Sequence, residues 1–87
     1  MKGKGPALDF VRVCWWDAQD LATTWAAPEA IAEFAEAPCE IISYGYLVKQ
    51  TKTYVAIAAD YVVVNGDFGR ITKIPRPWVR AINRIKA

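Results

Sequence analysis

Short segments in which apolar residues recur at every second position constrain the fold of this chain more than any other feature. The clearest is residues 10–17, where Val11, Val13 and Trp15 alternate with Arg12, Cys14 and Trp16. Successive side chains of a β-strand point to opposite faces, so we predict a strand here with Val11, Val13 and Trp15 toward the core. Trp16 then points to the other face, where it is exposed unless another surface covers it.

The same period of two continues after residue 39 and predicts four more strands. Gly45 lies inside the first of them and indicates a bend or bulge, which would let the strand curl around a small barrel. The Asn-Gly-Asp sequence at 65–67 is typical of a tight hairpin turn. The four predicted strands are residues 40–49, 53–61, 68–74 and 78–85.

The last of these segments has two interpretations. As a strand, it places Val79 and Ile85 on one face and Ile82 on the opposite face. A helix over residues 78–86 is the rival prediction, because the same three residues also fit helical spacing. We take the strand as the prediction and leave the helix open.

Residues 28–37 interrupt the strands and are predicted to form a short helix. Pro28 suits the first helical position, and Pro38 ends the helix. Ile31 and Phe34 belong to an apolar stripe on one side of it. Because a helix of about ten residues is not stable alone, we expect it to dock on the sheet.

Five short antiparallel strands, with one short helix inserted between strands 1 and 2, predict a mostly β fold. The bend and the tight turns favour a small five-stranded antiparallel SH3-like barrel, with an open sheet carrying the helix on one face as the alternative. We expect one domain spanning residues 1–87, with residues 1–8 as a flexible tail. The chain has no apolar run long enough for a membrane span and no secretory signal, so we expect a cytoplasmic protein without membrane contact.

A domain of 87 residues buries only about 60% of the surface of its unfolded chain and usually needs additional stabilisation. With two cysteines and no histidine, a zinc site lacks ligands. Cys14 and Cys39 could form one disulfide, although cysteines more often stay reduced in the cytosol. Self-association is therefore the expected stabiliser, and four Trp and four Tyr exceed what so small an interior holds. The candidate interface residues are Trp16, Trp78 and Ile82.

Charge is distributed unevenly along the chain. Residues 1–40 carry three basic and seven acidic residues, for a net charge of −4, whereas residues 41–87 carry eight basic and two acidic residues, for +6. The basic half could bind nucleic acid. It could also bind the acidic half of a neighbouring copy in a head-to-tail assembly, or the two halves could be solvated faces.

The residues needed for common enzyme chemistry are missing. Without histidine, neither a Ser/His nor a Cys/His nucleophile pair can form, and no glycine-rich phosphate loop is present. Asp17 and Asp20 could bind a cation, but two carboxylates on a loop are more often solvated or cap a helix. We therefore expect no enzyme activity, no catalytic residue, no metal and no cofactor.

Three stretches resemble a known family. Residues 11–17 match a V-x-V-x-W-x-D start, residues 45–59 have the form glycine, strand, polar turn, strand, and residues 74–79 form an Ile-Pro-basic turn before the last strand. Over roughly residues 10–85 the chain resembles the Sm-like family of small β-barrels, and more narrowly small phage-type Sm-like proteins. The resemblance implies a homo-oligomeric ring formed by edge-strand pairing.

The resemblance also implies binding of single-stranded RNA by loops around the pore of such a ring. Basic residues would neutralise phosphates, and Tyr54 or Trp78 could stack a base. The alternatives are that these aromatic residues fill subunit contacts, and that the protein is a structural phage component or a small-molecule or nucleotide binder. The candidate nucleic-acid contacts are Lys49, Lys52, Tyr54, Lys73, Arg76 and Arg80.

Overall fold

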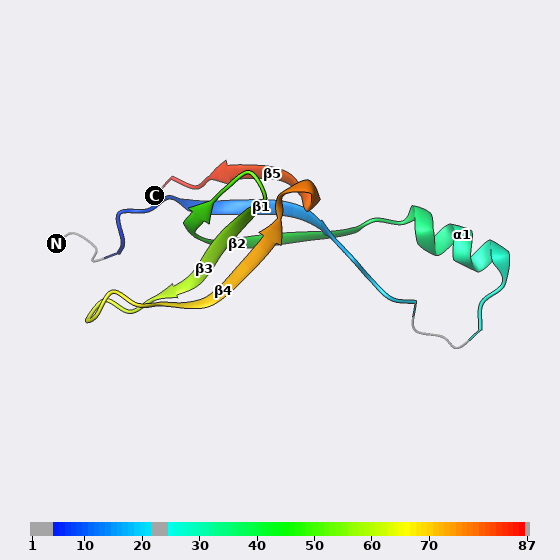
Figure 1. Cartoon of the computed structure of the whole chain (residues 1–87), viewed down its shortest axis with the longest axis horizontal. Helices are drawn as coiled ribbons and strands as arrows, with labels where there is room; N and C mark the ends of the chain where they lie inside the picture. Colours follow the sequence, from blue (N-terminus) through cyan, green and yellow to red (C-terminus); the bar gives the residue numbers. More distant parts are fainter. Residues whose placement is uncertain (1–4, 22–24, 87) are drawn as a thin grey trace.

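Five antiparallel strands form a single sheet in the order β4-β3-β2-β1-β5, as shown by the computed structural model in Figure 1. The structure describes residues 5–21 and 25–86 of the 87. The mostly β fold and the positions of the five strands are confirmed. The elements are β1 (Phe10–Asp17), helix α1 (Pro28–Glu36), β2 (Cys39–Gln50), β3 (Tyr54–Tyr61), β4 (Phe68–Pro75), one 3-10 turn η1 (Arg76–Trp78) and β5 (Val79–Arg84).

The sheet is open. Within the described residues, β4 pairs only with β3 and β5 pairs only with β1, so that each of these strands has one free edge. The strands are strongly twisted about one another (Figure 1), but they do not close into a barrel. The architecture is therefore an open five-stranded antiparallel sheet with one short helix.

The core lies on one face of this sheet. Val11, Val13 and Trp15 face it from β1 as predicted, Trp15 being partly buried. Gly45 on β2 is also buried, and a Cβ atom placed there would lie 2.7 Å from the carbonyl oxygen of Ala58 on β3. The close approach of two backbones therefore requires glycine at this position. The other core residues are Val55, Ile57 and Ile74, with Leu47, Val79 and Ile82 packed against them.

The last strand departs from simple alternation. β5 pairs Ile82 with Val13 and Val79 with Trp15, and the register shifts between Cys14 and Trp15. This β-bulge turns Val79 and Ile82 toward the same core, so the prediction that they lie on opposite faces is wrong. The bulge also explains the three-residue spacing that suggested a helix, and the helical alternative is wrong as well.

Helix α1 does not dock on the sheet, so that prediction is wrong. Figure 1 shows α1 beyond the ends of β1 and β2, at one end of the long axis of a molecule measuring 59 × 24 × 22 Å. None of its nine residues, all of which the structure describes, is buried. Below, "the arm" is residues 17–40 and "the sheet body" is the described remainder of the chain.

Two interactions hold the base of the arm. The β1–β2 ladder continues to the pair formed by Asp17 and Cys39. Beyond it, the side-chain amide of Gln19 donates a hydrogen bond of 3.1 Å to the carbonyl oxygen of Ala37. Because the two strands remain paired to their ends, the helix is carried past the edge of the core.

The two cysteines lie on neighbouring strands. Cys14 is buried on β1 opposite Ile42, and Cys39 is half-buried at the start of β2. Both are free thiols in the described chain, so the possible disulfide is absent from this structure. Cys14 acts as a small apolar residue in the sheet.

Two further expectations concern the N-terminal tail and membrane-spanning segments. Of the predicted tail, residues 1–4 lie outside the described residues, and residues 5–8 form neither helix nor strand. Among the described residues, no helix has both the length and the apolar character needed to cross a membrane.

Candidate functional site

The structure brings together the two basic turns that the sequence singled out. The backbone N–H of Arg76 in η1 donates a hydrogen bond of 2.9 Å to the carbonyl oxygen of Thr53 in the β2–β3 turn. Next to this bond, Tyr54 of β3 pairs with Pro75 of β4. Lys52 and Arg76, which are far apart in the sequence, therefore belong to one end of the sheet body.

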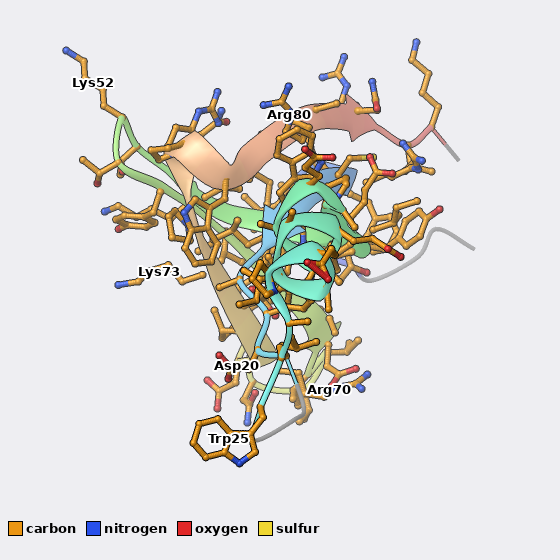
Figure 2. The ribbon with its side chains drawn as sticks, turned by 90° about the vertical axis from the view of Figure 1, so that its right-hand side faces the viewer. Asp20, Trp25, Lys52, Arg70, Lys73 and Arg80 are labelled. Carbon is orange, nitrogen blue, oxygen red and sulfur yellow. The ribbon has the colours of Figure 1, made fainter. Side chains whose placement is uncertain are left out.

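Lys73 and Tyr54 contact each other at this end. The Lys73 Nζ lies 5.1 Å from the centre of the Tyr54 ring, within the range of a cation–π interaction. In Figure 2, Lys52 and Lys73 point outward from the sheet. A flexible lysine over an aromatic ring, with a second lysine nearby, can bind a phosphate and an adjacent planar group.

Thr51 holds the turn that presents Lys52, and the sequence analysis did not identify it. Its hydroxyl oxygen accepts hydrogen bonds of 3.1 Å from the backbone N–H groups of Thr53 and Tyr54. This local bond fixes the backbone on both sides of Lys52. A threonine followed two or three residues later by a strand is the signal that could have identified it.

The two remaining candidate cations have different surroundings. Lys49 is exposed near the end of β2, beside the register shift between Leu47 and Lys49. The guanidinium carbon of Arg80 lies 4.2 Å from the centre of the Trp16 ring on the neighbouring strand β1. Arg80 therefore covers part of Trp16, which remains 44% exposed.

The three predicted interface residues also differ. Trp78 stacks on Trp15 with ring centres 6.5 Å apart and is 38% exposed. Ile82 is half-buried and packs against the core. Trp16 and Trp78 thus offer aromatic surface to a partner, whereas Ile82 contributes mainly to the core.

A groove of about 560 Å³ runs beside β5. Arginine side chains from η1 and β5 stand along it, and at one end Arg84 Nη1 lies 3.5 Å from Asp9 Oδ1. The groove has an apolar floor of Val11, Leu47, Val79 and Ile82, and a polar rim that includes Arg76 and Arg84, whereas the Arg80 side chain lies over Trp16. These residues come from four elements, so no single sequence motif identifies the groove.

Arg76 is the unusual residue of this groove. Its Nη1 atom is buried, yet it has no hydrogen-bond partner among residues 5–21 and 25–86. A buried donor that lacks an acceptor is destabilising, and a charged donor more so. Arg76 therefore contributes a positive charge to the groove wall, while its Nη1 atom lies beneath the surface.

Arg70 is an arginine whose charge is already paired. Its Nε and Nη2 atoms donate hydrogen bonds of 2.7 and 3.1 Å to the carboxylate of Asp60 on β3. These bonds lower the pKa of Asp60 and raise that of Arg70. Figure 2 shows Arg70 on the opposite side of the body from Lys52, so it does not belong to the basic end.

The described residues contain no group of three or more cysteine, aspartate and glutamate side chains that could hold a metal ion. Asp17 accepts a 2.8 Å hydrogen bond from the N–H of Ala18, so its carboxylate is bonded to the adjacent backbone.

Comparison with protein-family models, curated proteins and solved structures finds no match for this chain. The charges and geometry of these surfaces therefore supply the basis for assigning a function.

Proposed function

We propose that this chain is a cytoplasmic, self-assembling β module without enzymatic activity, whose copies associate into a homo-oligomeric ring. One observation carries the proposal. In the described residues, thirteen large apolar side chains are exposed, whereas only eight hydrophobic residues are buried. An excess of exposed apolar surface on a small chain favours association.

Part of this exposed surface is continuous. The register of β1 and β2 places Trp16, Ile42 and Tyr44 on the outer face of the sheet, opposite the core. All three are exposed, and Cys14 lies between them at the same face. An aromatic and aliphatic strip of this kind resembles the centre of a subunit interface.

The resemblance to Sm-like proteins suggests how the copies would be arranged. The order of the five antiparallel strands supports a relation to such a barrel, with β4 and β5 left as the unpaired edges of each copy. The free edges of β4 and β5 belong to the same sheet, so β4 of one copy can pair with β5 of the next. Repetition of a contact between two different surfaces produces a ring when the rotation closes.

The direct test is the mass of the purified protein in solution. Light scattering at micromolar concentration and above should give a multiple of the 9.7 kDa chain mass. Thr72→Pro on β4, where Thr72 pairs with Ile57 of β3, would disturb edge pairing, and circular dichroism checks that the sheet itself survives. A monomer at every concentration would overturn the proposal.

Binding of single-stranded RNA is the second candidate function, and the joining of the two basic turns favours it. Lys52 and Lys73 should contribute to phosphate contacts, and Tyr54 should stack on a base. Fluorescence anisotropy with a labelled single-stranded RNA should show binding that weakens steeply as salt rises. Lys52→Glu and Lys73→Glu should each reduce affinity, whereas Lys86→Glu is the matched control on the sheet body.

A further inference from the structure

We propose that the groove beside β5 is the docking site for the arm of a second copy of this chain. In this contact the apolar side of α1 lies on the groove floor, and acidic residues of the arm meet the rim arginines. The inference rests on the proposed self-association and specifies two surfaces that produce it.

Charge complementarity supports this contact. Residues 17–40 contain six acidic and no basic residues, which gives the arm a net charge of −6. The rest of the chain carries eleven basic and three acidic residues, a net charge of +8. Complementary patches of this size direct the arm of one copy toward the body of another. The acidic residues are Asp17, Asp20, Glu29, Glu33, Glu36 and Glu40.

Helix α1 lacks the packing that a short helix needs. An isolated helix of nine residues is marginal in water, and most of its stability must come from tertiary contacts. Ile31 is 51% exposed. Phe34 and Glu33 line a shallow hollow of about 320 Å³ together with Leu21. The arm thus presents an apolar surface with a carboxylate beside it.

Arg76 of the groove has a buried hydrogen-bond donor, its Nη1 atom. Its Nη1 atom has no acceptor among the described residues, although it lies in the wall of a groove with an apolar floor. A carboxylate that enters the groove would pair with the Arg76 guanidinium once this side chain turns outward, and guanidinium–carboxylate pairs are among the strongest in proteins. Glu33 would supply that carboxylate, because Glu33 and Phe34 line the same hollow of the arm.

Helix α1 lies away from the groove of its own chain, so the proposed occupant is the arm of another copy. The β1–β2 ladder is intact as far as Asp17 and Cys39, and it holds α1 beyond the end of the sheet. Figure 1 places α1 at one end of the long axis and β5 on the sheet body. The arm and the groove are different surfaces, so one copy can donate its arm and receive another at the same time.

The test uses two full-length variants that each damage one surface. The arm variant carries Glu33→Gln and Phe34→Ala, and the groove variant carries Arg76→Glu and Arg84→Glu. Sedimentation velocity should show that each variant alone associates about tenfold more weakly than the wild type or worse. Asp67→Lys and Lys86→Glu are charge reversals outside both surfaces and should leave association unchanged.

Mixing the two variants gives the decisive measurement. The groove variant retains an arm, and the arm variant retains a groove, so the mixture has one intact contact. We expect one-to-one association in the mixture that is stronger than the self-association of either variant alone. It should weaken as salt rises, because its charges are partly exposed. Circular dichroism of both variants checks that the sheet remains folded.

The outcomes separate this inference from the proposed function. A wild-type protein that associates, with variants that associate equally well, overturns the arm–groove contact and leaves self-assembly standing. A wild-type monomer overturns both. If the groove variant loses only RNA binding while association persists, the groove binds nucleic acid and the inference is wrong.

Discussion

The sheet body and the arm are both rich in apolar residues, but only the body has a core. Val13, Val55 and Ile74 come from three strands and are completely buried together. The arm has eight alanines among residues 17–40 and no buried residue among those that the structure describes. Alanine favours a helix but buries little surface. Apolar content therefore gives a core only where strands from distant parts of the chain meet.

The same contrast separates stability from assembly. The body has hydrogen-bonded strand partners and a packed interior, so its folding depends on its own residues. The arm has the ladder at its base and one short helix, so we expect its order to depend on a partner surface. Substitutions in the two regions should consequently affect different measurements.

The largest expected effect is in the core of the body. Ile74→Ala removes a completely buried side chain and should lower the free energy of unfolding by about 2–5 kcal/mol. Ile71→Ala, on the same strand but 53% exposed, should change it by less than about 0.5 kcal/mol. Urea unfolding followed by tryptophan fluorescence measures both, and equal losses would contradict the assigned core.

Gly45→Ala should have the next largest effect. The added methyl group would meet the backbone oxygen of Ala58, which cannot move without disturbing β3. Overpacking of this kind costs about 1–3 kcal/mol. Gly69→Ala is the matched control, since its Cβ would lie 3.6 Å from a side-chain atom of Asp60, an ordinary contact. The same unfolding experiment should separate the two variants.

A smaller effect is expected in the arm. Ala32→Gly costs about 1 kcal/mol in helix propensity, but α1 is not packed on the sheet, so unfolding of the body should hardly change. Ala56→Gly, in buried β3, should lower the free energy of unfolding. Hydrogen exchange at a concentration where the protein is monomeric should show weak protection in α1. Strong protection there would show that the arm is stable by itself.

The smallest effect is expected for Asp60→Asn, which weakens a pair on the surface of the body. The hydrogen bonds from Arg70 lower the pKa of Asp60 below its usual value of 3.8. The pair therefore stabilises the folded chain above that pH, and its contribution is lost as the pH falls through the lowered pKa. Both side chains are exposed, so the gain is small and salt should reduce it. The thermal midpoints of the two proteins should differ slightly at neutral pH and converge in acid.

The sequence allows the strands to be predicted because their signals are local. Alternation locates β1 and β3 almost to the residue, and the Asn-Gly-Asp turn at 65–67 separates β3 from β4. There, Gly66 has a positive φ of 80° and the Asn65 side chain accepts the N–H of Asp67. Such features depend only on neighbouring residues, so one sequence is enough to recognise them.

The arm and the groove depend on the path of the chain through space. An apolar stripe with Ile31 and Phe34 is typical of a helix that docks, but the β1–β2 ladder carries α1 beyond the core and none of its residues is buried. The bulge on β5 moves Ile82 to the core face, and the three-residue spacing that it produces in the sequence is equally typical of a helix. The groove joins Leu47 to Arg76 and Arg84, and it exists only once the sheet has formed.

The acidic arm at one end of a 59 Å molecule has a consequence for the motion of two copies before they touch. Separated charges of opposite sign along the longest axis give the protein a large electric dipole moment. Each copy then turns in the field of the other while they are still apart, so more collisions begin in a productive orientation. At low ionic strength the encounter rate should rise toward that of steered association, and added salt should return it to the rate of random collision.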